Sequence, residues 1–79
     1  MNQQFINYLS QVVDVLNAHA DKNEAMAQMI NLTAKLMGQD GNPINFNASQ
    51  ELKEMAGVLR EHGGYIQEVI DEPHLLIIQ

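Results

Sequence analysis

The sequence contains no cysteine, which excludes disulfide bonds and metal sites built on cysteine ligands and fits a reducing compartment. It also lacks tryptophan, and its only aromatic side chains are two tyrosines and two phenylalanines. A chain of 79 residues forms one domain at most, and so small a chain buries only a modest core. We therefore expect a single domain over residues 1–79, of marginal stability by itself and without cross-links.

Basic residues are scarce, because ten acidic residues outnumber four basic ones and give a net charge of −6. The four bases, Lys22, Lys35, Lys53 and Arg60, are scattered along the chain. Nucleic acids and anionic membranes attract proteins through clustered lysine and arginine, so direct binding to either is not expected. A basic protein partner is electrostatically allowed.

Long hydrophobic runs are also absent. No stretch approaches the roughly 20 apolar residues of a transmembrane helix. The first residues carry neither the early basic residues nor the unbroken apolar segment of a signal peptide. These two absences lead us to expect a cytoplasmic protein.

Apolar residues nevertheless make up 46% of the chain, and in the first half they follow a helical spacing. Residues 3–20 carry an apolar residue at every third or fourth position, which predicts an amphipathic helix. Asp21 with Glu24 three residues later resembles a capping box, so a second helix is predicted over residues 22–37. The two helices are expected to form an antiparallel hairpin that turns at residues 20–22.

The middle of the chain contains clear signals for helix ends. Gly38 stands where a C-terminal glycine cap belongs, and the Asp-Gly and Asn-Pro pairs of residues 39–43 favour turns. Asn47, with Gln50 three residues later, is typical of a helix start and predicts a third helix over residues 48–62.

The predicted third helix has one glycine in its interior and two directly after its end. Gly57 lowers helix stability by about 1 kcal/mol relative to alanine, so its presence points to close packing against another element. The adjacent Gly63 and Gly64 are expected to end the helix.

The C-terminal segment allows two interpretations. Residues 65–70 fit a short helix and, less cleanly, a strand, and Pro73 interrupts either one. Residues 75–78 are apolar and partly β-branched, which predicts a buried strand or a docked tail. The predicted fold class is therefore mainly α, with an N-terminal helical hairpin, a third helix and room for a small C-terminal β element. An α+β fold is the alternative.

No spacing in the sequence indicates catalysis or cofactor binding. The three histidines, His19, His62 and His74, are not paired at the i, i+3 or i, i+4 spacing of a helical metal site. Residues 40–51 have the length of a calcium loop, but the fifth and sixth positions lack the required oxygen ligand and glycine. We therefore expect a protein that is not an enzyme and has no cofactor, metal site or catalytic residue.

Several apolar residues lie outside the stripes that a three-helix core requires, and they indicate a binding surface. Met26, Met29, Met37 and Met55 lie in the predicted helical stripes, so we expect most of them to pack in the core. Methionine also adapts to the surfaces of partners, and in that role these residues would favour the same interpretation. The first functional hypothesis is a protein-interaction module that self-associates: an adaptor, a chaperone-like accessory factor or an assembly subunit. The candidate interface consists of Tyr8, Val15, Leu32, Val58, Leu75, Leu76, Ile77 and Ile78.

The alternative hypothesis is an acidic inhibitor, of the kind that phages and plasmids encode, that occupies a basic nucleic-acid-binding site on a target protein. It requires the acidic residues to gather on one face of the molecule. The C-terminal half supplies most of the acids, namely Glu51, Glu54, Glu61, Glu68, Asp71 and Glu72.

Overall fold

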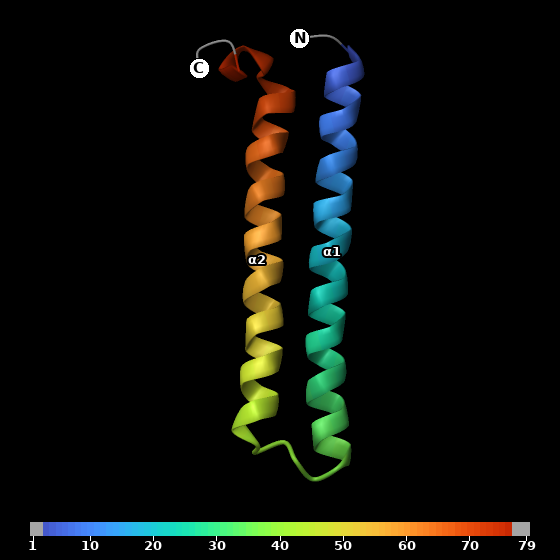
Figure 1. The fold of residues 1–79 in the computed structure, drawn as a ribbon, viewed down its shortest axis with the longest axis vertical. Helices are drawn as coiled ribbons and strands as arrows, with labels where there is room; N and C mark the ends of the chain where they lie inside the picture. Colours follow the sequence, from blue (N-terminus) through green and yellow to red (C-terminus); the bar gives the residue numbers. More distant parts are fainter. Residues whose placement is uncertain (1–2, 77–79) are drawn as a thin grey trace.

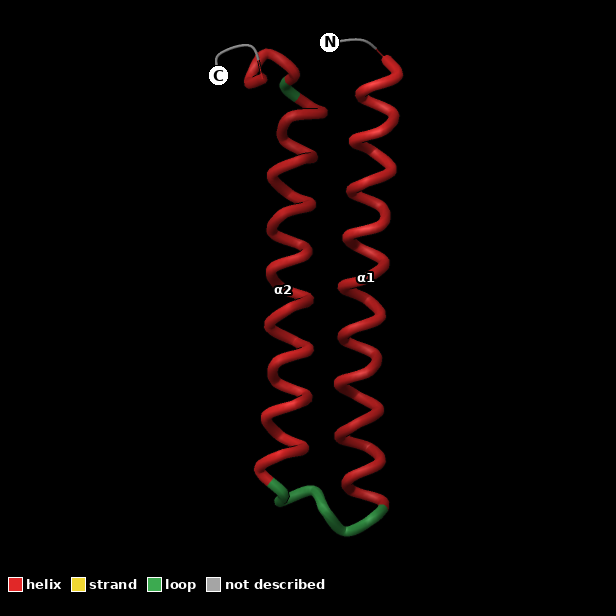
Figure 2. The backbone as a smooth tube through the Cα atoms, viewed as in Figure 1, coloured by secondary structure: helices red, strands yellow, loops and turns green. Residues whose placement is uncertain are grey.

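A computed structural model describes residues 3–76, which form two long antiparallel helices side by side (Figure 1). Helix α1 spans Gln3–Leu36 and helix α2 spans Pro43–Asp71, and a short loop joins them. A 3-10 turn, η1, follows at Pro73–Leu76. The two ends of the described chain lie together, away from the loop (Figure 2), and residues 3–76 contain no strand.

The predicted mainly α class is confirmed, but the predicted N-terminal hairpin is wrong: residues 3–36 are one helix, and the hairpin pairs α1 with α2. The turn predicted at residues 20–22 is wrong, because α1 continues through it. Residues 18–27 contain no glycine or proline and include four alanines, which favour helix more than any other residue type. Asp21 therefore does not cap a helix. Instead its carboxylate binds Arg60 of α2 at 2.7 Å.

Gly38 ends α1 as predicted. Its φ of +70° lies in the left-handed region, which glycine adopts without a steric penalty. The amide of Gly38 donates to the carbonyl of Lys35 (3.2 Å), and the amide of Gln39 donates to that of Ala34 (2.6 Å). These two bonds satisfy carbonyls that the end of the helix would otherwise leave without a donor.

We expect Gly38→Ala to destabilise the protein by about 1 kcal/mol, because a Cβ is strained in the left-handed region. Thermal unfolding followed by circular dichroism measures the change. Gly41→Ala in the same loop is the control, because Gly41 has neither a positive φ nor any atom within 4 Å of an added Cβ. Equal losses in the two variants would contradict the role assigned to Gly38.

Helix α2 begins five residues earlier than predicted. The side chain of Asn42 accepts a hydrogen bond from the amide of Ile44 (2.9 Å), and Pro43 occupies the first helical turn. The predicted breaker at residues 39–43 is therefore confirmed, whereas the predicted cap at Asn47 is wrong. Asn47 lies inside the helix because the Asn-Pro pair provides an earlier start.

The separate third helix is wrong, because residues 48–62 form the middle of α2 and the described residues contain no third long helix. The helix runs through Gly63 and Gly64, since its packing along α1 outweighs their low helix propensity. Residues 65–70 are helical, which excludes the strand there.

Pro73 interrupts the chain after α2 as expected, but the segment that follows it does not begin with a strand. Helix α2 ends at Asp71, shortly before Pro73. Leu75 and Leu76 belong to η1, so the buried strand expected from residue 75 does not form at these two positions. Ile77 and Ile78 lie outside the described residues.

The two helices pack along a seven-residue repeat, which we call the seam. Leucine and isoleucine residues between its buried positions are half-buried, so the pattern is that of an antiparallel coiled coil. Among the residues whose side chains the structure describes, no large side chain is fully buried. The buried positions are instead small residues apart from one valine: Val13, Ala20, Ala27 and Ala34 in α1, and Ser49, Ala56 and Gly63 in α2.

The contacts of Gly63 indicate which residues face each other across the seam. A Cβ added at Gly63 would lie 3.5 Å from Oδ1 of Asn17 and 4.0 Å from both Cβ of Leu16 and Cγ1 of Val13, so Gly63 packs against the turn of α1 that has Leu16 at its centre. From this contact, residues at the same height on the two antiparallel helices can be assigned as facing pairs. Each central pair contains at least one small residue. The pairs are Ala20 with Leu59, Asn23 with Ala56, Ala27 with Leu52, and Ile30 with Ser49.

Gly57 does not mark the close approach that we expected of it. A Cβ added at Gly57 or at Gly64 meets no atom within 4 Å. Gly57 follows the seam residue Ala56 by one position, a rotation of about 100° around the helix, and therefore lies outside the seam. The packed glycine is Gly63, which the sequence had indicated as a helix end.

Candidate interaction surface

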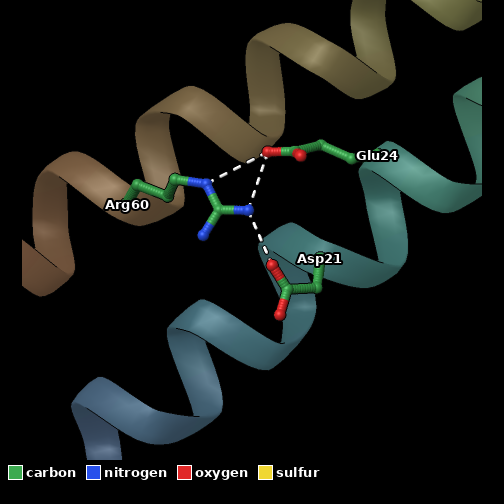
Figure 3. Close-up of polar contacts among 3 residues, drawn as sticks. All are labelled: Asp21, Glu24 and Arg60. Atoms are coloured by element: carbon green, nitrogen blue, oxygen red, sulfur yellow. Dashed lines mark hydrogen bonds and ion pairs between the residues drawn. The ribbon is translucent and has the colours of Figure 1, made fainter.

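The hairpin has two flanks, one on each side of the seam, and the first is polar. On this flank Nη2 of Arg60 donates to Oδ1 of Asp21 (2.7 Å) and to Oε1 of Glu24 (2.8 Å), as Figure 3 shows. The hydrogen bonds with Asp21 and then with Glu24 raise the pKa of Arg60 above its usual value. All three side chains are solvent-exposed or half-exposed, so this ion pair helps to align the helices but adds little stability.

The position of these three residues relative to the seam identifies the other flank. Asp21, Glu24 and Arg60 each follow a seam residue by one position. Successive residues of a helix are rotated by about 100°, so residues that precede a seam residue point to the opposite flank. In an antiparallel pair this holds for both helices at once.

The residues that precede the seam are predominantly apolar on both helices, and most are exposed. They repeat at alternating intervals of three and four residues, as the seam residues themselves do. We call this surface the apolar face. It comprises Phe5, Tyr8, Val12, Val15, Met26, Met29 and Leu36 of α1, and Ile44, Met55, Val58, Tyr65 and Val69 of α2.

Exposure and shape both fit a binding surface. Met29 is 65% exposed and Met55 55% exposed, which is unusual for side chains in the middle of long helices. Three hollows open to solvent along this face. Two have volumes of about 470 Å³, one beside Met29 and one beside Met55 and Val58, and a third of about 250 Å³ lies beside Tyr8 and Val15.

Most charged residues lie outside the apolar face. Between Phe5 and Val69 the flank that contains it holds one base, Lys22, and one acid, Glu51, together with His19 and His62. Its formal charge is zero when the histidines are neutral. The net charge of −6 is therefore carried by the other sides of the hairpin and its ends.

Comparison with protein-family models, with curated proteins and with solved structures found no match. The arguments on function therefore start from the surface. Its many exposed hydrophobic residues suggest an interaction surface.

The structure places the residues of the predicted interface in different positions. Tyr8, Val15 and Val58 lie on the apolar face. Leu32 is also exposed, but it follows the seam residue Ile30 by two positions and lies on the side of α1 away from α2. Leu75 and Leu76 belong to η1, and Ile77 and Ile78 lie outside the described residues.

Sequence reasoning missed several residues of this face, namely Met26, Met29, Met55 and Tyr65. The methionines had been assigned to helix cores, because the core was expected to need three helices. The sequence did contain a signal for this face. Besides the apolar series of the seam, it has a second apolar series at alternating intervals of three and four residues, and each member precedes a seam position by one residue. Two such series on one helix indicate contacts on two sides.

Two further features are absent from the part of the chain that the structure describes. Within residues 3–76, no group of three or more His, Asp or Glu side chains is placed to hold a metal ion. Neither long helix contains a stretch apolar enough to cross a bilayer.

Proposed function

We propose that this protein is a protein-interaction module, acting as an adaptor, an accessory factor or an assembly subunit, whose apolar face binds a helical partner. The observation that carries the proposal is the second series of exposed apolar residues along both helices. An amphipathic partner helix binds such a series by packing its own apolar side chains, spaced three and four residues apart, between the side chains of the series. In this proposal the chain binds and does not catalyse.

The chemistry of the two flanks supports this assignment. Met26, Met29 and Met55 are flexible side chains that adapt to a partner surface, and the hollows beside the last two offer space for its side chains. The largest apolar patch of a typical monomer covers about 300–600 Å², whereas this face follows both long helices. The polar flank is occupied by the Arg60 ion pairs, which remain hydrated.

Photo-crosslinking in the producing cells tests the proposal. A benzoylphenylalanine at Val58, on the apolar face, is expected to form covalent adducts with protein. The same residue at Glu61, on the outer side of α2, is the control. Adducts at Val58 but not at Glu61 would support the proposal, and mass spectrometry would identify the adduct. Equal yields at the two positions, or none at Val58, would contradict it.

One observation favours the acidic-inhibitor hypothesis as a second candidate. Glu54, Glu61 and Glu68 follow one another at seven-residue intervals, so they form an acidic row along the outer side of α2. Such a row is complementary to a basic groove. Adducts at Glu61 and none at Val58 in the same experiment would favour this candidate.

A further inference from the structure

We propose that the partner of the apolar face is a second copy of this chain. The two hairpins would stack face to face as a four-helix bundle, with His19 and His62 of both copies at the centre of the interface. This inference rests on the proposed function and names its partner. It follows from the size, the charge and the symmetry of the apolar face.

The first argument is the shape of the single hairpin. Its radius of gyration is 17.4 Å, whereas a compact domain of this length has roughly 12 Å. Its accessible surface is 5875 Å², against roughly 4,800 Å² for a compact monomer of this mass. The hairpin forms a single layer of helices, and stable domains are built from at least two packed layers. A second hairpin supplies the missing layer.

The second argument is area. The hairpin measures 54 Å by 20 Å in its two longer dimensions, so one face covers roughly 1,000 Å². A stable protein–protein interface needs about 800 Å² from each partner. Contact over most of the face therefore suffices for a stable dimer, and the exposed apolar residues extend along nearly its whole length.

The third argument is charge. Two copies of a chain with a net charge of −6 repel each other, so they can associate stably only through a surface that is not acidic. The flank with the apolar face meets this condition, because Lys22 balances Glu51. The acidic row of Glu54, Glu61 and Glu68 lies along the outer side of α2, at the edge of such an interface, where Glu54 borders the hollow beside Met55 and Val58.

The fourth argument is the position of the histidines. His19 precedes Ala20, and His62 precedes Gly63, so both lie on the flank of the apolar face, near the middle of the hairpin. Apolar residues lie on both sides of this pair. Lys22 and Glu51 are the other strongly polar residues of this flank, and Lys22 lies one turn from His19. A polar centre in a predominantly apolar interface favours one register of the helices, because a shifted alignment buries polar groups against apolar ones.

Two-fold symmetry then brings the histidines of the two copies together. With the axis parallel to the helices, His19 of one copy lies over His62 of the other. With the axis perpendicular to the helices and the loops at opposite ends, full overlap places His19 over His19 and His62 over His62. Either arrangement produces a central layer of four imidazoles.

Sedimentation equilibrium over a wide concentration range tests the inference. We expect the wild type to show twice the chain mass of 8.9 kDa. We expect Val15→Glu with Val58→Glu to weaken the dimer on the order of 100-fold or more, because the interface would bury unpaired charges. Gln28→Glu with Gln50→Glu makes the same change in charge at exposed positions outside the face, and this control should remain dimeric.

Disulfide trapping keeps the test decisive even if the glutamate variant unfolds. Under mild oxidation, His19→Cys alone is expected to form a covalent dimer if the loops lie at opposite ends. A mixture of His19→Cys and His62→Cys forms the mixed dimer if the loops lie at the same end. Gln28→Cys, on the other side of α1, is the control and should not form a disulfide at a comparable rate.

The outcomes separate this inference from the proposed function. A dimer trapped through residue 19 or 62 supports both. A monomeric wild type with no trapped dimer overturns the inference, and adducts at Val58 with a different protein would leave the proposed function standing. A monomer without adducts at Val58 overturns both.

Discussion

Ala27→Leu is expected to destabilise the protein by about 1–3 kcal/mol, because it overfills the seam where the helices are in contact. Ala27 is completely buried and lies opposite Leu52, which already occupies that layer. Leucine forms helix almost as well as alanine, so the loss would come from packing alone. Urea unfolding followed by circular dichroism, at one fixed protein concentration, measures the change.

The matched control is Ala25→Leu. It makes the same substitution on the same helix two residues away, at an exposed position. Its stability should stay within about 0.5 kcal/mol of the wild type. If the two variants were equally stable, the helices would not be held close together by small residues, and the assigned seam would be wrong.

The double variant Gly57→Ala with Gly64→Ala is expected to stabilise the protein by about 2 kcal/mol and to raise Tm by roughly 10 °C. Both glycines lie inside α2, where alanine is favoured by about 1 kcal/mol for each position. An added Cβ meets no atom within 4 Å at either site, so the gain is not offset by a clash. Differential scanning calorimetry measures the shift.

Gly41→Ala is the comparison for this variant. Replacing Gly41 by alanine also reduces the conformational entropy of the unfolded chain, but Gly41 lies in the loop and not in a helix. We therefore expect this variant to gain less stability than the double variant. A double variant with an unchanged or lower Tm would mean that another chain approaches α2 on the polar flank. That result would contradict a partner bound only through the apolar face.

The elements that could be predicted from the sequence are those set by neighbouring residues. Gly38 ends α1, and the Asn42–Pro43 pair starts α2, because a left-handed glycine and an Asn-Pro pair act within one turn of the chain. The cap signals at Asp21 and Asn47 are equally local, but they lie in segments where the helix continues. A favourable cap stabilises a helix start by about 1 kcal/mol, which is too little to interrupt a helix that packs along its whole length.

The candidate surface was accessible from the sequence only in part. Tyr8, Val15 and Val58 were selected because they did not fit the stripes expected for a three-helix core. Met26, Met29 and Met55 fitted those stripes and were assigned to the core. The number of helices decides which apolar residues are internal, and this number depends on whether the chain turns at residues 20–22.

The sequence by itself determined the helical character of the chain, the break in the helices at residues 39–43 and the acidic, cysteine-free composition, because propensity, turn chemistry and charge are local properties. Only the tertiary structure decided that there are two long helices, that Gly63 is packed and Gly57 is open, and that apolar residues gather on one flank. These features depend on the register between α1 and α2. Register is determined by contacts between residues that are far apart in the chain, such as Leu16 with Gly63 and Glu24 with Arg60.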